Sequence, residues 1–168
     1  MMKKITFLLS VFALTMAMQA NAQLEKHQAT FIYNFTRLVQ WPEFYKDPAF
    51  ILGVLGSNEA ITQELRASLG DRTVAGKQIQ IVEFASAAEL TKCHLLFVPN
   101  SKSGQLNRAV AALSNQPALI VTEHQGRQPA GSIINFSVED GKLGIRLDEE
   151  LAEAKKLLVS RQLANFSR

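Results

Sequence analysis

The sequence predicts a single α/β domain of the three-layer, Rossmann-like type, with a mostly parallel sheet that a C-terminal antiparallel hairpin and helix complete. Short apolar runs at Phe50–Leu55, His94–Val98 and Ala118–Thr122 are typical of strands that are buried on both faces. Segments with helical spacing separate these runs, as in a parallel sheet covered by helices. An Asp-Gly step within Glu139–Lys142 predicts the closing hairpin.

The chain begins with the features of a secretory leader. Two lysines precede the apolar run Ile5–Met18, and Ala20-Asn21-Ala22 ends in small residues, which is typical of a Sec signal peptide. The apolar run is shorter than the ~20 residues that a membrane-spanning helix needs. We therefore expect residues 1–22 to be cleaved, and residues 23–168 to form one domain outside the cytoplasm with no membrane insertion.

Charge and composition exclude one large class of partner. The chain has 18 lysines and arginines against 15 acidic residues, a net charge of +3, and two of these lysines belong to the leader. There is no run of basic residues, so we predict that the protein does not bind nucleic acid.

The predicted domain opens with an aromatic segment, Phe31–Pro42. Its apolar residues recur with helical spacing and predict one broad apolar stripe: Phe31, Phe35, Leu38 and Val39. Pro42 disfavours helical geometry at the residue before it, so the helix is expected to end at Trp41. Phe31 and Phe35 are expected to pack in the core, and Trp41 is left open between core and contact surface.

The middle of the chain alternates strands and helices. After the strand Phe50–Leu55 come Gly56-Ser57-Asn58 and a helix with one apolar face, and Lys77–Phe84 forms the next strand. Ser86 and Glu89 have the spacing of a capping box for a short helix. The helical face consists of Ile61, Leu65 and Leu69.

The second half repeats the pattern and then changes it. Ser103 is expected to cap a helix between the strands His94–Val98 and Ala118–Thr122. Ser132–Val138 and Leu143–Leu147 form the hairpin. Asp148 is expected to open one last helix, whose inward residues are Leu151, Ala154, Leu157 and Leu158.

Three loops at the carboxyl ends of predicted strands are possible ligand sites, because ligands of open α/β sheets bind there. They are Gly56–Asn58, Asn100–Gly104 and Thr122–His124, and the first two supply the candidate residues. Their candidate residues are Ser57 and Asn58 in the first loop and Asn100, Ser101, Lys102 and Ser103 in the second. Lys102 and backbone amides could receive an anion. Neither nucleotide-binding glycine motif is present, so an ordinary polar loop is the favoured interpretation.

No arrangement of residues predicts catalysis, a metal site or a cofactor. None of the three histidines has a partner at zinc-ligand spacing, and the sequence lacks the G-x-S-x-G motif of serine hydrolases. Cys93 is the only cysteine, so an internal disulfide is excluded. It is expected to be a buried small apolar residue.

The order and spacing of several motifs resemble the YfiR family of periplasmic proteins from Gram-negative bacteria. The resemblance extends over nearly all of the chain after the leader. The similar segments are Phe31–Phe35 with Trp41-Pro42, Phe50–Gly56, Cys93–Val98, Gly131–Phe136, Lys142–Asp148 and Ser160–Leu163.

The resemblance implies a periplasmic regulator that binds the periplasmic domain of an inner-membrane diguanylate cyclase and represses it, so that cyclic di-GMP and biofilm formation are controlled. Tyr33, Arg37 and Trp41 are the candidate partner-binding residues, since such side chains dominate interfaces. Family members can carry redox-responsive disulfides, which this chain cannot form internally. A small-ligand binding module using the strand-end loops is the alternative, a hydrolase is disfavoured, and a homodimer stays open.

Overall fold

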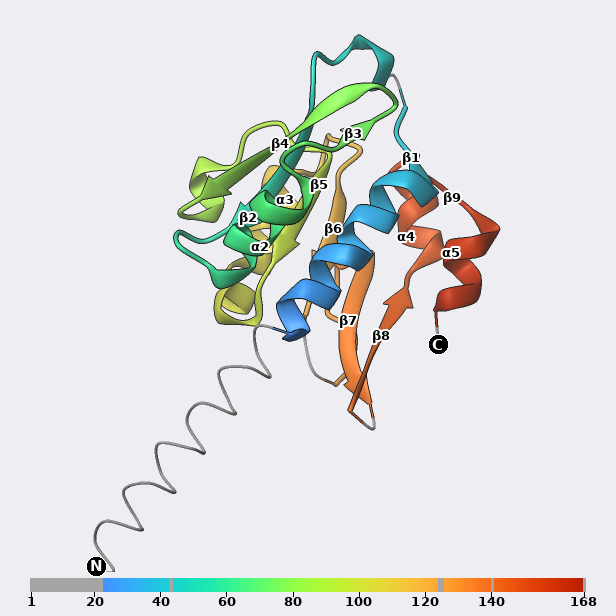
Figure 1. Cartoon of the computed structure of the whole chain (residues 1–168). Helices are drawn as coiled ribbons and strands as arrows, with labels where there is room; N and C mark the ends of the chain where they lie inside the picture. Colours follow the sequence, from blue (N-terminus) through green and yellow to red (C-terminus); the bar gives the residue numbers. More distant parts are fainter. Residues whose placement is uncertain (1–22, 43, 124–125, 140, 168) are drawn as a thin grey trace, which may run out of the picture.

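The computed structural model describes residues 23–42, 44–123, 126–139 and 141–167, so the predicted leader, residues 1–22, lies outside the described part (Figure 1). A helix spans residues 23–38, and a seven-stranded sheet lies behind it. The strands follow the order β3 (Thr73–Val74), β4 (Lys77–Phe84), β2 (Phe50–Leu55), β5 (Leu95–Val98), β6 (Leu119–Thr122), β7 (Ile134–Glu139) and β8 (Lys142–Leu147).

The sheet has the predicted connectivity. Neighbouring strands from β4 to β7 run parallel, and β2 pairs with both β4 and β5. β7 and β8 form the antiparallel hairpin, in which Glu139 pairs with Lys142 and Gly141 adopts a φ of +71°. The predicted fold class, a mostly parallel α/β sheet finished by an antiparallel pair, is therefore confirmed.

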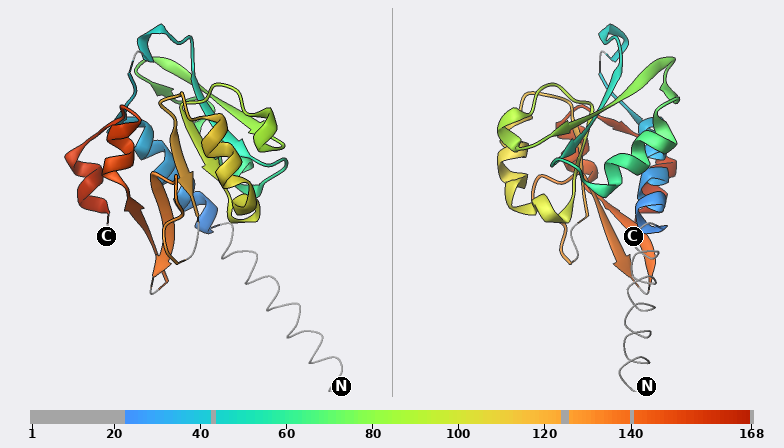
Figure 2. Two further views of the ribbon diagram at one scale, coloured as in Figure 1. Left: turned by 180° about the vertical axis from the view of Figure 1, so that it is seen from behind. Right: turned by 60° about the vertical axis from the view of Figure 1, so that its left-hand side comes forward.

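Successive side chains along each strand point to opposite faces of the sheet, and they form two separate cores. In β5, Leu95 and Phe97 pack in one core, whereas Leu96 and Val98 pack in the other. The helix of residues 23–38, α2 (Ala60–Leu69), α4 (Glu149–Ala154) and α5 (Arg161–Phe166) contribute to the first core. The second lies under α3 (Leu106–Ala112) and the 3-10 turn η2 (Ala87–Glu89), and the sheet runs between the two helical layers (Figure 2).

The aromatic helix packs as predicted but ends earlier. Phe35 is fully buried, and its ring lies 5.7 Å from that of Phe136, while Phe31 is partly buried beside both. The helix ends at residue 38, because Val39–Gln40 form the short strand β1 and pair with β9 (Leu158–Val159). The prediction that the helix continues to Trp41 was wrong for this reason.

The predicted single C-terminal helix was also wrong. The side chain of Asp148 accepts a hydrogen bond from the Leu151 amide at 2.8 Å, so the predicted N-cap is present. The helix α4 nevertheless stops at Ala154, since Lys156 adopts a left-handed φ of +60°. Leu158 then lies in β9 and is 66% exposed, not inward-facing.

Neither predicted serine cap contacts the backbone in the expected way. Ser86 makes no capping bond to η2, although its Oγ donates to the Glu89 carboxylate at 3.3 Å. Ser103 lies inside the 3-10 segment η3 (Asn100–Gln105), and Gln105 occupies the N-cap position of α3. Ser86 thus occupies the predicted N-cap position without its capping bond, whereas the 3-10 segment η3 begins before Ser103 and moves that serine out of the cap position.

Candidate functional site

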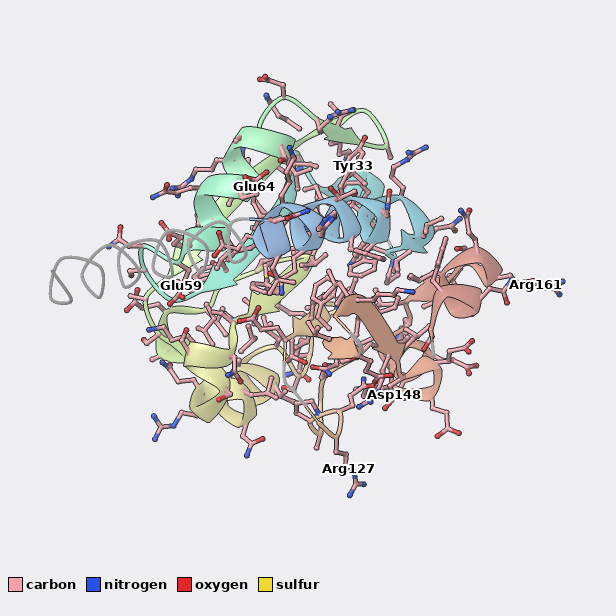
Figure 3. The ribbon with its side chains drawn as sticks, turned by 60° about the horizontal axis from the view of Figure 1, so that its bottom comes forward. Tyr33, Glu59, Glu64, Arg127, Asp148 and Arg161 are labelled. Carbon is pink, nitrogen blue, oxygen red and sulfur yellow. The ribbon has the colours of Figure 1, made fainter. Side chains whose placement is uncertain are left out.

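The three residues predicted to contact a partner line one surface depression. Tyr33, Arg37 and Trp41 face a hollow of about 380 Å³. Its other wall is the turn between β3 and β4, and in Figure 3 Tyr33 lies on the outer side of the helix toward this green hairpin. The structure thus brings together residues from the helix end, β1 and the hairpin.

The rim of this depression is cationic. The guanidinium carbon of Arg37 lies 5.9 Å from the centre of the Tyr33 ring, and that of Arg72 lies 5.2 Å from it. Both distances allow cation–π attraction, which keeps two positive charges beside one aromatic surface. Arg37 is exposed and Tyr33 is half-buried. This combination suits a partner surface that carries acidic groups.

Trp41 contributes mainly to packing. It is only 8% exposed, its ring centroid lies 4.9 Å from that of Phe50, and its Nε1 donates a hydrogen bond to the carbonyl of His94 at 2.8 Å. A satisfied indole N–H is what burial of tryptophan requires. Only a small part of the side chain therefore faces the depression.

His94 connects the segments around Trp41. Its Nδ1 accepts a hydrogen bond from the Ile51 amide at 2.9 Å, and its Nε2 lies 2.9 Å from the Asp47 carboxylate. The ring stacks on Phe50 with centroids 4.9 Å apart and meets the edge of Phe44 at 5.0 Å. One imidazole thus joins β2, the residues before β5 and the loop at Asp47.

These contacts determine the protonation state of His94. Because a backbone N–H donates to Nδ1, that nitrogen carries no proton, and the neutral ring must donate from Nε2 to Asp47. Burial lowers the pKa of His94 below its ordinary 6.5, and the nearby Lys92 charge acts in the same direction, whereas Asp47 opposes both. The ring is therefore held neutral at pH 7.

Asp47 is the charged partner in this cluster. Burial alone would raise its pKa, but hydrogen bonds and charges from Lys92 and His94 outweigh that effect, so its pKa lies below the ordinary value. Lys92 binds the second carboxylate oxygen, and Lys77 donates to the Asp47 and Phe44 carbonyls. The ionised carboxylate thus orients His94 and Lys92, while Lys77 holds the turn from Phe44 to Asp47 through its carbonyls.

A pH dependence of stability follows from the low pKa of His94. The unfolded chain takes up this proton near pH 6.5 and the folded chain only at lower pH, so stability is complete above pH 6.5 and falls below it. We expect the free energy of unfolding to decrease between about pH 7.5 and 5.5, by at most about 1.4 kcal/mol per pH unit. Urea titrations across this range, which lies above the ordinary carboxyl pKa values, measure the slope.

The corresponding control is the His94→Asn variant. Asparagine does not titrate, so its slope over the same range should be smaller than that of the wild type. An unchanged slope in this variant would assign the pH dependence to other groups.

The two loops with predicted ligand residues lie at the carboxyl ends of β2 and β5, whereas His94 lies at the amino end of β5. Ser101 Oγ donates to the Glu59 carboxylate at 3.2 Å, and Lys102 Nζ lies 3.4 Å from the same carboxylate. The two loops are therefore neighbours. Ser57 and Ser103 are exposed, and Asn58 adopts a left-handed φ of +59°.

Acidic side chains occupy the loop amides that an anion would use. The Asn58 amide donates to Glu83 at 2.8 Å, and the Asn100 amide donates to Glu123 at 2.8 Å. An anionic ligand at these loops would have to displace carboxylates of the protein itself. Binding of a ligand by these six residues stays a prediction.

Sequence reasoning missed the cluster of His94, Asp47 and Lys92. Asp47 precedes His94 by 47 positions, so no local spacing connects them. The only available signal was a polar residue next to the apolar strand Leu95–Val98. Cys93, beside it, is 2% exposed and packs in the second core, and burial raises its pKa to about 12. The expectation that Cys93 is a buried apolar residue is confirmed.

Within residues 23–167, apart from the undescribed positions, no cluster of histidine, cysteine and carboxylate side chains has the geometry to bind a metal ion. In the same part of the chain, no helix combines the length and apolar character needed to span a bilayer.

Comparison with known proteins supplies the family. A search of curated proteins finds no match. The model of the family described as YfiR/HmsC-like matches residues 25–168, which is nearly the whole chain after the predicted leader. The aromatic helix, the parallel sheet and the closing hairpin all lie within this match, and the chain therefore belongs to the YfiR/HmsC-like family of periplasmic regulatory domains.

Proposed function

We propose that this protein binds the periplasmic domain of an inner-membrane diguanylate cyclase and holds the cyclase inactive. Membership of the YfiR/HmsC-like family is the observation that carries the proposal. The predicted leader would deliver the domain to the periplasm. The protein would act by binding and not by turnover, and its release would raise cyclic di-GMP and favour biofilm formation.

Repression by binding sets a thermodynamic requirement. A binding protein shifts a two-state equilibrium only when its affinities for the two states differ. The contact surface must therefore have a stable shape that fits the inactive conformation of the cyclase better than the active one. Trp41, fixed by its bond to the His94 carbonyl, gives the depression such a stable wall.

The depression around Tyr33 is our proposed contact surface. It offers an aromatic ring, an exposed Arg37 and the second guanidinium of Arg72, which are residue types enriched among interface hot spots. Tyr33 and Arg37 would make the direct contacts. Trp41 would contribute its exposed edge and, more importantly, the shape of the surface.

Deletion of the gene tests the function. Cyclic di-GMP in cells that express the cognate cyclase should rise after deletion and return to its former level when the wild-type gene is restored. Unchanged cyclic di-GMP in these cells would contradict the proposal. A pull-down from solubilised membranes with residues 23–168 as bait should recover a protein that contains a diguanylate cyclase domain.

The Arg37→Glu variant tests the contact surface. Reversing an exposed interface charge should weaken cyclase binding at least tenfold, or by about 1.4 kcal/mol. When the deletion strain is complemented with this variant, cyclic di-GMP should stay high. Stability should stay within about 0.5 kcal/mol of the wild type, since Arg37 is exposed. Microscale thermophoresis with the purified periplasmic domain measures the affinity.

Arg161→Glu is the matched control, because Arg161 extends into solvent from α5, away from Tyr33 (Figure 3). This variant should bind the cyclase domain and restore repression like the wild type. Equal loss in both variants would indicate a general charge effect and would count against the Tyr33 surface.

The alternative is a periplasmic small-ligand binding module that uses the loops of Asn58 and Lys102. It predicts that a specific metabolite raises the melting temperature in a screen. The bonds from the loop amides to Glu83 and Glu123 weigh against it, because a ligand would have to compete with them.

A further inference from the structure

A second groove lies on the other side of Trp41, at the amino ends of the parallel strands. It consists of two hollows of about 400 and 540 Å³ that share Pro42, Asn115, Gln116 and Pro117, so they form one continuous depression. We call it the lysine groove, and its defining residues are Trp41, Pro42, Lys92, Gln116, Pro117 and Lys156.

The charge of this groove is strongly one-sided. Four lysines line it, against a single carboxylate, that of Asp47. Asp47 is already bound to Lys92 and His94, which leaves it little capacity to neutralise the others. Lys155 donates to the carbonyls of Leu113 and Ser114, and these contacts hold the segment after α3 in place. The groove therefore attracts groups of negative charge.

Lys156 is presented in an unusual conformation. It is exposed, and among the residues that the structure describes it makes no side-chain hydrogen bond or ion pair. Its φ of +60° is one that glycine or asparagine adopts far more readily than lysine. A lysine in the position where glycine would usually end a helix suggests that its charge is useful at this place.

Gln116, which lines both hollows, carries an unused hydrogen-bond acceptor. Gln116 Oε1 is buried and has no hydrogen-bond partner among the described residues. Such an atom is costly when it is left unpaired, and an N–H donor from a bound molecule would satisfy it. An extended peptide supplies backbone N–H donors, whereas inorganic anions without protons do not.

We propose that the lysine groove binds an extended acidic segment of a partner protein, with carboxylates at Lys156 and Lys92 and a backbone N–H at Gln116. The rings of Trp41, Pro42 and Pro117 provide the apolar surface on which the segment lies. This site is separate from the Tyr33 depression, and it does not depend on the identity of the cyclase.

The Lys156→Gly variant provides a sharp test, because it separates binding from folding. Glycine removes the charge and accepts the left-handed conformation, so the melting temperature should equal or exceed that of the wild type. Binding of a fluorescein-labelled hexaglutamate peptide, measured by fluorescence anisotropy, should weaken at least fivefold. Lys26→Gln, at an exposed lysine on the N-terminal helix, is the control and should bind like the wild type.

The Gln116→Leu variant tests the acceptor of Gln116. Removing a buried unpaired oxygen should not lower the melting temperature, and the affinity for hexaglutamate should still fall. Wild-type binding should also weaken as salt rises from about 0.05 to 0.5 M, because the attraction is electrostatic.

Three results would overturn the proposal. They are equal affinity of hexaglutamate and hexaglutamine for the wild type, wild-type affinity in Lys156→Gly, and displacement of the peptide by millimolar inorganic phosphate. The last result would make a small anion the occupant. Each is distinguishable from failure of cyclase repression, since the peptide assay contains no cyclase.

Discussion

Replacing Trp41 by alanine is expected to lower the free energy of unfolding by about 4 kcal/mol, one of the largest effects of any single substitution in this chain. The indole is 8% exposed, packs edge-on against Phe50, and donates to the His94 carbonyl. Truncation leaves a cavity in the first core and removes the bond. Urea denaturation followed by circular dichroism measures the loss without relying on tryptophan fluorescence.

Two comparison variants show how much of this loss comes from the indole hydrogen bond and how much from burial of the ring. Trp41→Phe should cost only about 1.5 kcal/mol, since the His94 carbonyl keeps its hydrogen bond from the Leu119 amide at 2.8 Å and is not left unpaired. Phe166→Ala removes an aromatic ring that is 56% exposed and should cost less than about 1 kcal/mol. A Trp41→Ala variant as stable as Phe166→Ala would show that the indole is a contact residue and not part of the core.

The fold could be predicted because strand burial leaves a strong signal in the sequence. Runs such as Leu95–Val98 are apolar at every position, and only a strand covered on both faces requires this. The short antiparallel pair of β1 and β9 left no comparable signal. It joins Val39–Gln40 to Leu158–Val159 through backbone hydrogen bonds, and such bonds do not depend on residue type.

The C-terminal error has a specific cause. Helical spacing continues through Leu157 and Leu158, and the sequence contains no glycine at which the helix would be expected to end. Lys156 nevertheless adopts the left-handed conformation and turns the chain into β9. A lysine in the left-handed conformation cannot be identified from propensity alone, because such a φ is rare outside glycine and asparagine.

One candidate site could be predicted from local sequence, and the other could not. Tyr33 and Arg37 lie one turn apart on the helix of residues 23–38, and Trp41 follows soon after it, so their proximity could be predicted from their nearness in the sequence. The contacts of His94 with Asp47 and Ile51 depend on how β2 and β5 pair, and that information is absent from either segment by itself. Tertiary polar clusters of this kind become visible only when the sheet is assembled.

His94→Ala is the second substitution for which we expect a large effect, a loss of about 3 kcal/mol of unfolding free energy. The variant removes a ring that stacks on Phe50 and meets Phe44 edge-on, and it leaves the Ile51 amide without its acceptor. His27→Ala, at an exposed histidine, is the matched control and should cost less than about 0.5 kcal/mol. Thermal and urea unfolding of both variants at pH 7.5 measure the difference.

The His94→Asn variant separates the hydrogen bond from the packing of the ring. The asparagine oxygen occupies about the place of Nδ1, so it can accept from the Ile51 amide, but its short side chain cannot reach Asp47. Asparagine should therefore recover part of the stability that alanine loses. Equal stability of the two variants would mean that the Ile51 bond contributes nothing. Recovery by asparagine would show that an uncharged acceptor beside β2 is what this position requires, because protonation of Nδ1 removes that acceptor as surely as truncation does.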